Sequence, residues 1–513
     1  RNLPVNQTLV VKAGDTKDIY SYPVNPSKTI FTSTDVEKMH HSENLFNDFT
    51  VQRLLPNYLS RQGPSLAIGD VNKDGLNDVF LGAAKGSVSK LFLQKADGSF
   101  NEFSKNTFTT DSSGEVTAST FFDADGDGDP DLYVAYGGFE FNENDPSFQD
   151  KLFMNDGKGS FTEKKLPSLL FSKGCVKSAD IDGDGDLDLF VGGRLIPGKY
   201  PLAAPSKILL NDGKGNFTDV TKTIAPSFDT LGMVTDAVWI DINHDKKKDL
   251  VVVGEWMPIK FFLNTEGKLK DASADFIHFA STGWWNRITA SDIDNDGDED
   301  LVIGNAGTNT QFHATEKEPV SITYKDFDNN NSIDPILQYY VEDTLFPALS
   351  RDDLAEQLPF IKKNFLTYKS YSTATMADIF TREQLTGSNT LSAALMETVY
   401  LENKGTEFIL HHLPAEAQYS PVYGIVVADF DGDKKKDILL TGNNTWTRVK
   451  FGRYSANHGV LLSGDDKGNF SYLPQTKSGL NVRSNVRSAV PLSDKKVLLG
   501  VNDGNVLQLS FNK

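Results

Sequence analysis

The chain has 513 residues, 39% of them hydrophobic and 24% charged, which is typical of folded domains. Seventy acidic residues against 51 basic ones give a formal charge of −19, which argues against a nucleic-acid partner because phosphate binding needs a clustered basic surface. No run of about 18 apolar residues occurs, so we expect no membrane span, and the single Cys175 can form no intramolecular disulfide.

Residue 1 is Arg, and no signal-peptide pattern follows it. We therefore expect the sequence to come from a processed or longer protein.

A nine-residue acidic pattern, D-x-[DN]-x-[DN]-x-x-x-D, recurs seven times along the chain. It begins at Asp70, Asp123, Asp180, Asp241, Asp292, Asp326 and Asp429. Ca²⁺ takes about 6–8 oxygen ligands, and alternate side chains of a tight loop can converge on one ion. Positions 1, 3, 5 and 9 would supply side-chain oxygens and position 7 a backbone carbonyl, so the pattern predicts about seven Ca²⁺ sites.

The predicted metal ligands follow from these positions. They are Asp70, Asn72, Asp74, Leu76 and Asp78; Asp123, Asp125, Asp127, Asp129 and Asp131; Asp180, Asp182, Asp184, Asp186 and Asp188; Asp241, Asn243, Asp245, Lys247 and Asp249; Asp292, Asp294, Asp296, Asp298 and Asp300; Asp326, Asp328, Asn330, Ser332 and Asp334; and Asp429, Asp431, Asp433, Lys435 and Asp437.

Position 6 of each loop should adopt a positive φ, which glycine permits. Glycine stands there in four loops, and Lys246, Asn331 and Lys434 stand there in the others. Lysine tolerates this conformation poorly, so the loops at Asp241 and Asp429 are the expected exceptions to calcium binding.

The main alternative for such loops is the EF-hand, which needs a Glu at position 12 and a helix on each side. Position 12 is apolar in every loop here, as at Leu81 and Val134. Each loop also runs into a short strand-like segment such as DVFLG or DLFVGG, so we expect the loops to join two strands.

The repeat unit reads as strand A, acidic loop, strand B, long loop, strand C, tight turn and strand D. Successive loops start 53, 57, 61 and 51 residues apart, from Asp70 to Asp292. Four strands in about 50–60 residues predict a blade of a β-propeller. Six loops follow an A-type strand, and residues 484–492 begin a seventh blade without a metal loop, so the fold class is all-β, a seven-bladed propeller.

Two further features set the predicted boundaries. Residues 47–56 (NDFTVQRLLP) resemble the strand-D segment GNFTDVTKTIAP, so we expect them to close the ring by completing the seventh blade, with the propeller at 45–513 and a separate N-terminal segment at 1–44. The interval from Asp292 to Asp429 is 137 residues, too long for one blade. It predicts a small α+β insertion at 305–395 in the fifth blade, with the seventh loop on a hairpin and helices within 351–370 and 375–385.

With these loops and the turns of the NDGKGxF type, the sequence resembles FG-GAP/VCBS-repeat propellers, the group that includes the integrin α-subunit propellers. Within that group it is most similar to the propeller of bacterial ASPIC/UnbV-associated proteins, on NLFNDFTVQRLLPNYLSRQGPSLAIGDVNKDGLND and RDDLAEQLPF. The opening VNQTLVVKAGD resembles the end of an ASPIC/UnbV module. The resemblance implies an exported protein, secreted or at the outer-membrane surface.

No catalytic motif accompanies the eight histidines, so we expect a binding scaffold and not an enzyme. The long loops leave the propeller on the face opposite the acidic loops. That face would bind a glycan or a protein partner at the cell surface through aromatic and arginine side chains. The candidates are Arg194, Trp256, Trp284, Trp285, Arg287, Trp446, Arg453 and Tyr454.

Three alternatives remain open at this point. The same aromatic residues could simply pack the insertion onto the ring. The propeller could carry a polysaccharide lyase or hydrolase, because fold alone does not decide function. It could also be a purely structural module of a larger surface protein.

Overall fold

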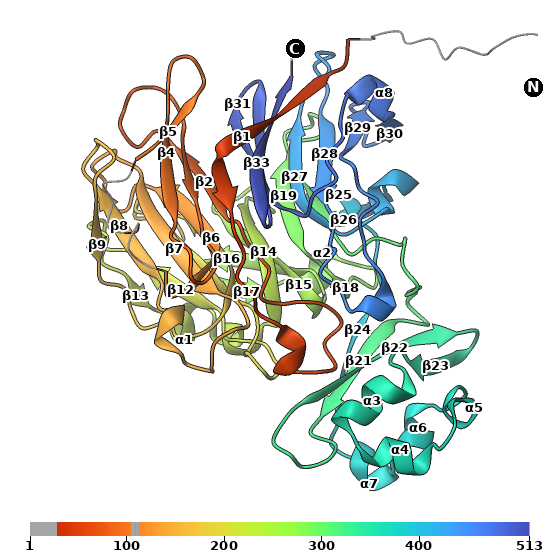
Figure 1. The fold of residues 1–513 in the computed structure, drawn as a ribbon. Coiled ribbons are helices and arrows are strands. Elements are labelled where there is room, and N and C mark those ends of the chain that lie inside the picture. The colour runs from red at the N-terminus through yellow and green to blue at the C-terminus, as the bar shows by residue number, and fades with distance from the viewer. Residues whose placement is uncertain (1–27, 104–107, 109–111, 512–513) are drawn as a thin grey trace, which may run out of the picture.

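The computed structural model describes residues 28–103, 108 and 112–511, which form eight sheets, each built on four strands in a line (Figure 1). Seven sheets repeat one plan, in which each strand pairs antiparallel with the next. A short extra strand, β18 (Gly283–Trp284), pairs with the second strand of the fourth sheet. The predicted all-β class is therefore confirmed.

Sheets 1 to 7 are numbered here in chain order of their first strands. Sheet 1 contains β2 (Leu66–Gly69), β3 (Asp78–Leu81), β4 (Lys90–Gln94) and β5 (Phe100–Glu102); sheet 2 contains β6 (Glu115–Phe122), β7 (Asp131–Gly137), β8 (Lys151–Asn155) and β9 (Phe161–Lys164). Sheet 3 contains β10 (Lys173–Ala179), β11 (Asp188–Gly193), β12 (Lys207–Leu210) and β13 (Thr218–Asp219); sheet 4 contains β14 (Met233–Ile240), β15 (Asp249–Met257), β16 (Lys260–Thr265) and β17 (Lys268–Asp271). Sheet 5 contains β19 (Arg287–Ser291), β20 (Asp300–Gly304), β25 (Val399–Asn403) and β26 (Phe408–His412); sheet 6 contains β27 (Val422–Ala428), β28 (Asp437–Gly442), β29 (Val460–Gly464) and β30 (Phe470–Leu473). Sheet 7 contains β31 (Val486–Ser493), β32 (Lys496–Val501), β33 (Gly504–Phe511) and β1 (Phe31–His41).

The first strands of these seven sheets form a closed ring. Each contacts the first strand of the next sheet, and β31 contacts β2. Seven buried apolar clusters lie between successive sheets, for example Phe80 of sheet 1 with Leu132 of sheet 2, and Leu498 of sheet 7 with Phe92 of sheet 1. Radially arranged four-stranded sheets around an axis define a β-propeller.

The second strand of each sheet has an apolar sequence without alternation, and its position in the fold explains this. All residues of β3, β7, β11 and β15 are buried, because both faces of each sheet pack against a neighbouring sheet. The acidic loop lies directly before this strand. The closing Asp of the loop is the first residue of the buried strand, as Asp78 is of β3, so the strand holds it in place.

Sheet 7 is closed by β1, which pairs antiparallel with β33 from Phe31↔Phe511 to Thr34↔Gln508 and beyond. The prediction that residues 47–56 form this strand is wrong. The closing strand lies upstream of them, and the predicted module end at residues 5–15 lies outside the described residues.

Residues 42–64, the cross-face segment, run instead over the face opposite the acidic loops. The segment contains the short helix η2 (Asp48–Thr50), and its Leu54 and Leu55 are buried. The Asp48 carboxylate accepts the backbone N–H groups of Leu59 and Ser60 at 2.5 and 2.9 Å. These contacts give the segment a fold of its own, which a short similarity to strand D could not reveal.

Between β20 and β25 the chain leaves sheet 5 and forms sheet 8, which lies outside the ring at the lower right of Figure 1. The cross-face segment contacts this part of the chain, for example through Gln52 and Ile333. Sheet 8 has the order β23 (Thr344–Pro347), β22 (Asp334–Val341), β21 (Val320–Lys325), β24 (Asn389–Ala393). Five short helices follow β23: α3 (Arg351–Gln357), α4 (Phe360–Asn364), α5 (Tyr368–Tyr371), α6 (Met376–Ile379) and α7 (Arg382–Leu385). Pro359 separates α3 from α4, because the residue before a proline disfavours helix.

The remaining helices are short. α1 (Thr221–Ile224), α2 (Ser273–Phe276) and α8 (Gln475–Ser478) follow fourth strands, and η4 (Pro146–Phe148), η5 (Pro226–Thr230), η6 (Ala415–Gln418) and η7 (Val449–Phe451) lie in connections. Among the described residues, no helix has the length and apolar character needed to cross a membrane.

Candidate functional site

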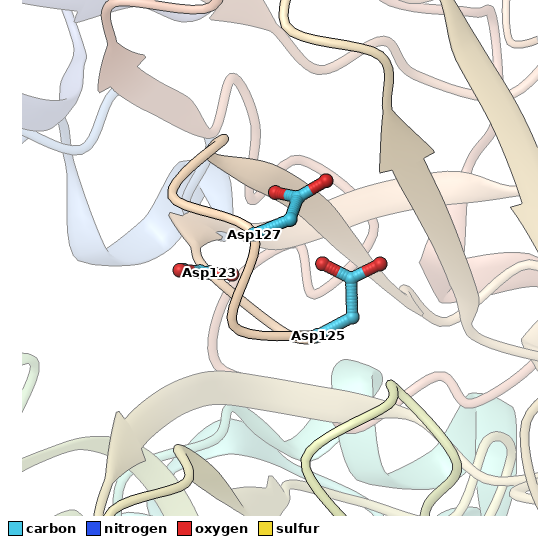
Figure 2. Close-up of side chains that lie close together, drawn as sticks. All are labelled: Asp123, Asp125 and Asp127. Carbon is cyan, nitrogen blue, oxygen red and sulfur yellow. The ribbon is translucent and has the colours of Figure 1, made fainter.

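Five of the seven acidic loops gather three carboxylates whose oxygens lie within 4.8 Å of one another. The groups are Asp123, Asp125 and Asp127; Asp180, Asp182 and Asp188; Asp292, Asp294 and Asp296; Asp326, Asp328 and Asp334; and Asp429, Asp431 and Asp437. Figure 2 shows the first of them, with the three side chains on the turns of one loop. The loops at Asp70 and Asp241 have Asn72 and Asn243 at position 3, so they offer an amide oxygen there.

The backbone of the loops follows one conformation. Position 6 has a positive φ in all seven, including 67° at Lys246 and 72° at Lys434. Lysine therefore does not change the turn. Position 4 also has a positive φ in every loop, as at Lys73 and His244. The acidic pattern predicted this conformation only for position 6.

Two hydrogen bonds recur in each loop. The position 7 N–H donates to the position 5 side chain, as from Asp129 to Asp127 at 2.9 Å. The position 2 N–H donates to the closing Asp, as from Ala124 to Asp131 at 2.9 Å. These bonds turn the position 5 side chain and the closing Asp toward the inside of the turn.

The closing aspartates are the most buried carboxylates of the loops. Burial raises the pKa of Asp78, Asp131, Asp188, Asp249, Asp300, Asp334 and Asp437 to about 6 in each case. Each also accepts a second hydrogen bond, in six loops from the third strand or the residue directly after it, such as the Asn155 N–H to Asp131 at 2.7 Å. The closing Asp therefore fastens the loop to its sheet, and in three loops it also joins the carboxylate cluster.

Four loop carboxylates have an oxygen that is buried and lacks a hydrogen-bond partner within the described structure. These are Oδ1 of Asp125, Asp129, Asp292 and Asp328, and only that of Asp129 has a cation beside it, Lys73. Buried charged oxygens without a partner are costly unless they coordinate a cation. The clusters could therefore hold metal ions, and their all-oxygen donor set is compatible with calcium.

The opposite face carries the eight residues predicted to bind a ligand, and two of them do not fit that role. Trp285 is fully buried between sheets 4 and 5, and Trp256 is 3% exposed and packs against sheet 8 residues. The prediction that these tryptophans wall an open pocket is wrong. Their rings face the interior because sheets and the segment around sheet 8 cover them, which residue type alone does not reveal.

The other tryptophans are half-buried. The Trp284 ring packs against that of Trp256 at a tilt of 37°, with the ring centroids 4.6 Å apart. Trp446 donates through Nε1 to Asn502 at 3.1 Å, and the Arg61 guanidinium stacks on its ring. Packing therefore accounts for much of the aromatic content of this face.

Arg194 and Arg287 lie near the axis and are engaged by neighbours. Arg194 forms an ion pair with Glu255 through Nη2. Arg287 donates to the carbonyls of Tyr423 and Arg487, both at 2.9 Å.

Arg453 and Tyr454 lie together in an open groove of about 680 Å³ between sheets 5 and 6. Thr308, Asn309, Gln418, Tyr419 and His458 also line it. Tyr419 is 39% exposed, a high value for a large aromatic side chain. Sequence reasoning missed Tyr419 and His458, because each lies in a connection with no recognisable motif.

The fold and its repeated loops define the class of protein: a β-propeller with acidic loops between the first and second strands of its sheets. A family model described as FG-GAP-like repeat matches residues 70–134 and 241–303. The chain therefore carries FG-GAP-like repeats. No curated protein matches it by sequence.

Several solved structures are similar to the chain at low sequence identity. An Agrocybe aegerita lectin that recognises non-reducing terminal N-acetylglucosamine is 13% identical, covering 82% of this chain and 79% of its own, with a TM-score of 0.43. YCF48 bound to D1 peptide is 9% identical, covering 97% and 100%, with a TM-score of 0.41. The V. cholerae biofilm matrix protein Bap1 is 10% identical, covering 93% and 91%, with a TM-score of 0.34.

Proposed function

We propose that the protein is a seven-bladed propeller, held rigid by calcium, that works outside the cytoplasm as a binding scaffold. Sheets 1 to 7 are its blades, and residues 305–398 are an insertion in the fifth blade. Its partner is a glycan or a protein, bound on the face opposite the acidic loops. Calcium supports the blades and takes no part in the contact.

The open groove between sheets 5 and 6 carries the proposal. It combines an exposed aromatic side chain, Tyr419, with the cationic Arg453 and with amide and hydroxyl groups such as Asn309. Aromatic and arginine side chains beside a few polar groups are the usual composition of recognition sites. Its volume of about 680 Å³ lies within the range of roughly 300–1,000 Å³ that is usual for ligand sites.

The loop chemistry supports a location outside the cytoplasm. Small all-oxygen loops of extracellular modules bind calcium with dissociation constants of roughly 10⁻⁴–10⁻³ M. Such sites fill only where calcium is near millimolar. A cytoplasmic protein would gain nothing from seven of them.

A glycan array probed with the calcium-loaded protein tests the function, followed by titration of each hit. Tyr419→Ala and Arg453→Ala should each weaken binding about tenfold or more while leaving the melting temperature unchanged. Arg483→Ala is the matched control, because Arg483 is exposed and lies outside the groove lining. A pull-down from surface extracts with the same variants covers a protein partner. Binding that ignores both groove variants would overturn the assignment, and no partner in either screen would favour a structural module.

A second candidate, a polysaccharide lyase, is favoured by one observation. The groove holds Arg453 beside His458 and two tyrosines, and a lyase needs a base near a cation. Against it, burial raises the pKa of Tyr454, whose hydroxyl lies 3.1 Å from Thr310, so this phenol is a poor base at neutral pH. Incubation with acidic polysaccharides should give no unsaturated product. An unsaturated product that forms with the parent protein and not with His458→Ala would establish the lyase.

A further inference from the structure

The first strands of the ring enclose a polar channel of about 590 Å³ along the propeller axis. Hydroxyl side chains line much of it, including Ser65, Thr117, Ser119, Ser178 and Thr289. Toward the groove face it narrows into two crevices of about 50 and 40 Å³. Thr117, Arg287 and Arg487 line both the channel and the first crevice, so the spaces adjoin.

Three arginines from three different sheets meet at this narrowing. Arg194 follows β11, Arg287 begins β19, and Arg487 is the second residue of β31. Arg287 is fixed by its bonds to two carbonyls and lies 3.5 Å from Asp236. The other two are less completely paired.

Arg487 is 6% exposed and Arg194 is 9% exposed, and the Nε of each has no hydrogen-bond partner within the described residues. Thr117 Oγ1, at the same narrowing, is also buried without a partner. Arg487 makes one long bond, 3.4 Å from Nη2 to Asn444, and stacks on Tyr423. Buried donors normally find acceptors, so this end of the channel offers unused donors.

The local charge is positive although the protein carries −19. Two carboxylates near the narrowing, Glu255 and Asp236, pair with Arg194, Arg287 and Lys177. A third carboxylate of the channel, Glu299, has its own cation, Lys248, at 3.9 Å. No carboxylate within the described chain lies within ion-pair distance of Arg487.

One further carboxylate acts on Arg487 at longer range. Glu43 is bound to Asn502 at 2.5 Å, and burial raises its pKa to about 7. It therefore balances Arg487 only in part. An uncompensated buried guanidinium is unfavourable and is stabilised by an anion.

We infer that this narrowing is an anion site, and that it takes the carboxylate of a small sugar acid whose hydroxylated body lies in the channel. The crevices admit a few non-hydrogen atoms, which fits a carboxylate group and not a sugar ring. The channel is large enough for the ring, and its hydroxyl side chains both donate and accept, as sugar hydroxyls do. The Arg487 Nε and the Thr117 hydroxyl are the donors free to bind the carboxylate. The site is separate from the groove and holds whether or not the groove binds a partner.

Calorimetric titration of the calcium-loaded full chain tests the inference with four probes: sodium glucuronate, glucose, sodium acetate and sodium sulfate. Glucuronate should bind, glucose should not, and acetate should bind at least tenfold more weakly than glucuronate. Arg487→Gln should weaken glucuronate about tenfold or more, because a charge-assisted hydrogen bond is lost. Arg483→Gln, at an exposed position in the connection before β31, should change nothing.

Thr117→Val provides a second variant of nearly equal shape, which should weaken glucuronate severalfold even if Arg487→Gln lowers the melting temperature. If sulfate binds as tightly as glucuronate and displaces it, the narrowing still binds anions, but its assignment to a sugar acid is overturned. Glucose binding with the affinity of glucuronate, or no heat from any of the three anions, would overturn the site itself. The groove ligand serves as a separate check. If the Arg487→Gln protein still binds it, failure of the anion site leaves the proposed function of the groove intact.

Discussion

The side-chain amide of Asn155 donates a hydrogen bond of 2.9 Å to the backbone carbonyl of Val71, 84 residues earlier in the chain. Asn155 ends the third strand of sheet 2, and Val71 is the second residue of the acidic loop of sheet 1. The bond recurs from Asn211 to Ala124 at 2.8 Å and from Asn264 to Ile181 at 2.6 Å. The turn of one sheet is thus tied to the acidic loop of the sheet before it.

Asn155→Ala should lower the free energy of unfolding by about 1–3 kcal/mol, because it leaves the buried carbonyl of Val71 and the half-buried carbonyl of Pro130 without their donor. Urea unfolding measures the change. Asn216→Ala is the control, because Asn216 lies exposed in the corresponding turn and bonds only Asp212. It should stay within about 0.5 kcal/mol of the parent. Equal effects of the two variants would show that the tie between sheets is not stabilising.

Removal of calcium should lower the melting temperature. Each ion that binds only the folded state adds about 1 kcal/mol at millimolar calcium if its dissociation constant is near 10⁻⁴ M. Calorimetry in excess EGTA and after calcium is restored measures the effect, with magnesium as the control cation. An unchanged melting curve in EGTA would contradict a structural role for the ions.

Lys246→Gly should raise the free energy of unfolding by about 1 kcal/mol, because Lys246 has a φ of 67° and a side chain disfavours this conformation. The backbone N–H that donates to Asp241 at 2.8 Å remains in the variant. The neighbouring Lys247→Gly is the control, since Lys247 lacks a positive φ and glycine should there be neutral or destabilising. A loss of stability in Lys246→Gly would mean that the lysine side chain contributes a contact worth more than the strain.

The acidic loops could be predicted from sequence because their chemistry is local. Nine residues fix which oxygens converge, and the glycine at position 6 signals the turn. The closing strand could not be predicted in this way, because NDFTV at 47–51 and GNFTD at 215–219 are locally alike and only long-range pairing separates them. Trp285 and Tyr419 show the same limit on the binding face. Whether an aromatic ring is buried or exposed depends on which segment covers it.

The half-buried Glu43 should make stability depend on pH. Its pKa is about 7 in the folded protein, mainly through burial, against a usual value of 4.5. The folded state therefore binds the proton more tightly, so the contribution is complete below pH 4.5 and is lost as the pH rises through 7. Glu43→Gln should raise the free energy of unfolding at pH 8 by about 2 kcal/mol and flatten its fall between pH 5 and 8. Glu37→Gln, exposed on β1, is the control, and a Glu43→Gln profile parallel to that of the parent would contradict the assignment.

Phe31→Ala should be among the most destabilising single changes, because Phe31 anchors the strand that completes sheet 7. Its side chain is 1% exposed, and its ring lies 5.1 Å from that of Phe430 and 5.6 Å from that of Phe511. Truncating a buried phenylalanine costs about 3–5 kcal/mol through lost burial and the cavity left behind. Thr34→Ala, on the exposed side of β1 and paired opposite Gln508, keeps the same backbone pairing and should change stability by less than about 0.5 kcal/mol. Chemical denaturation of both variants measures the difference. Since β33 would be an open sheet edge without β1, a neutral Phe31→Ala would mean that another segment closes the ring.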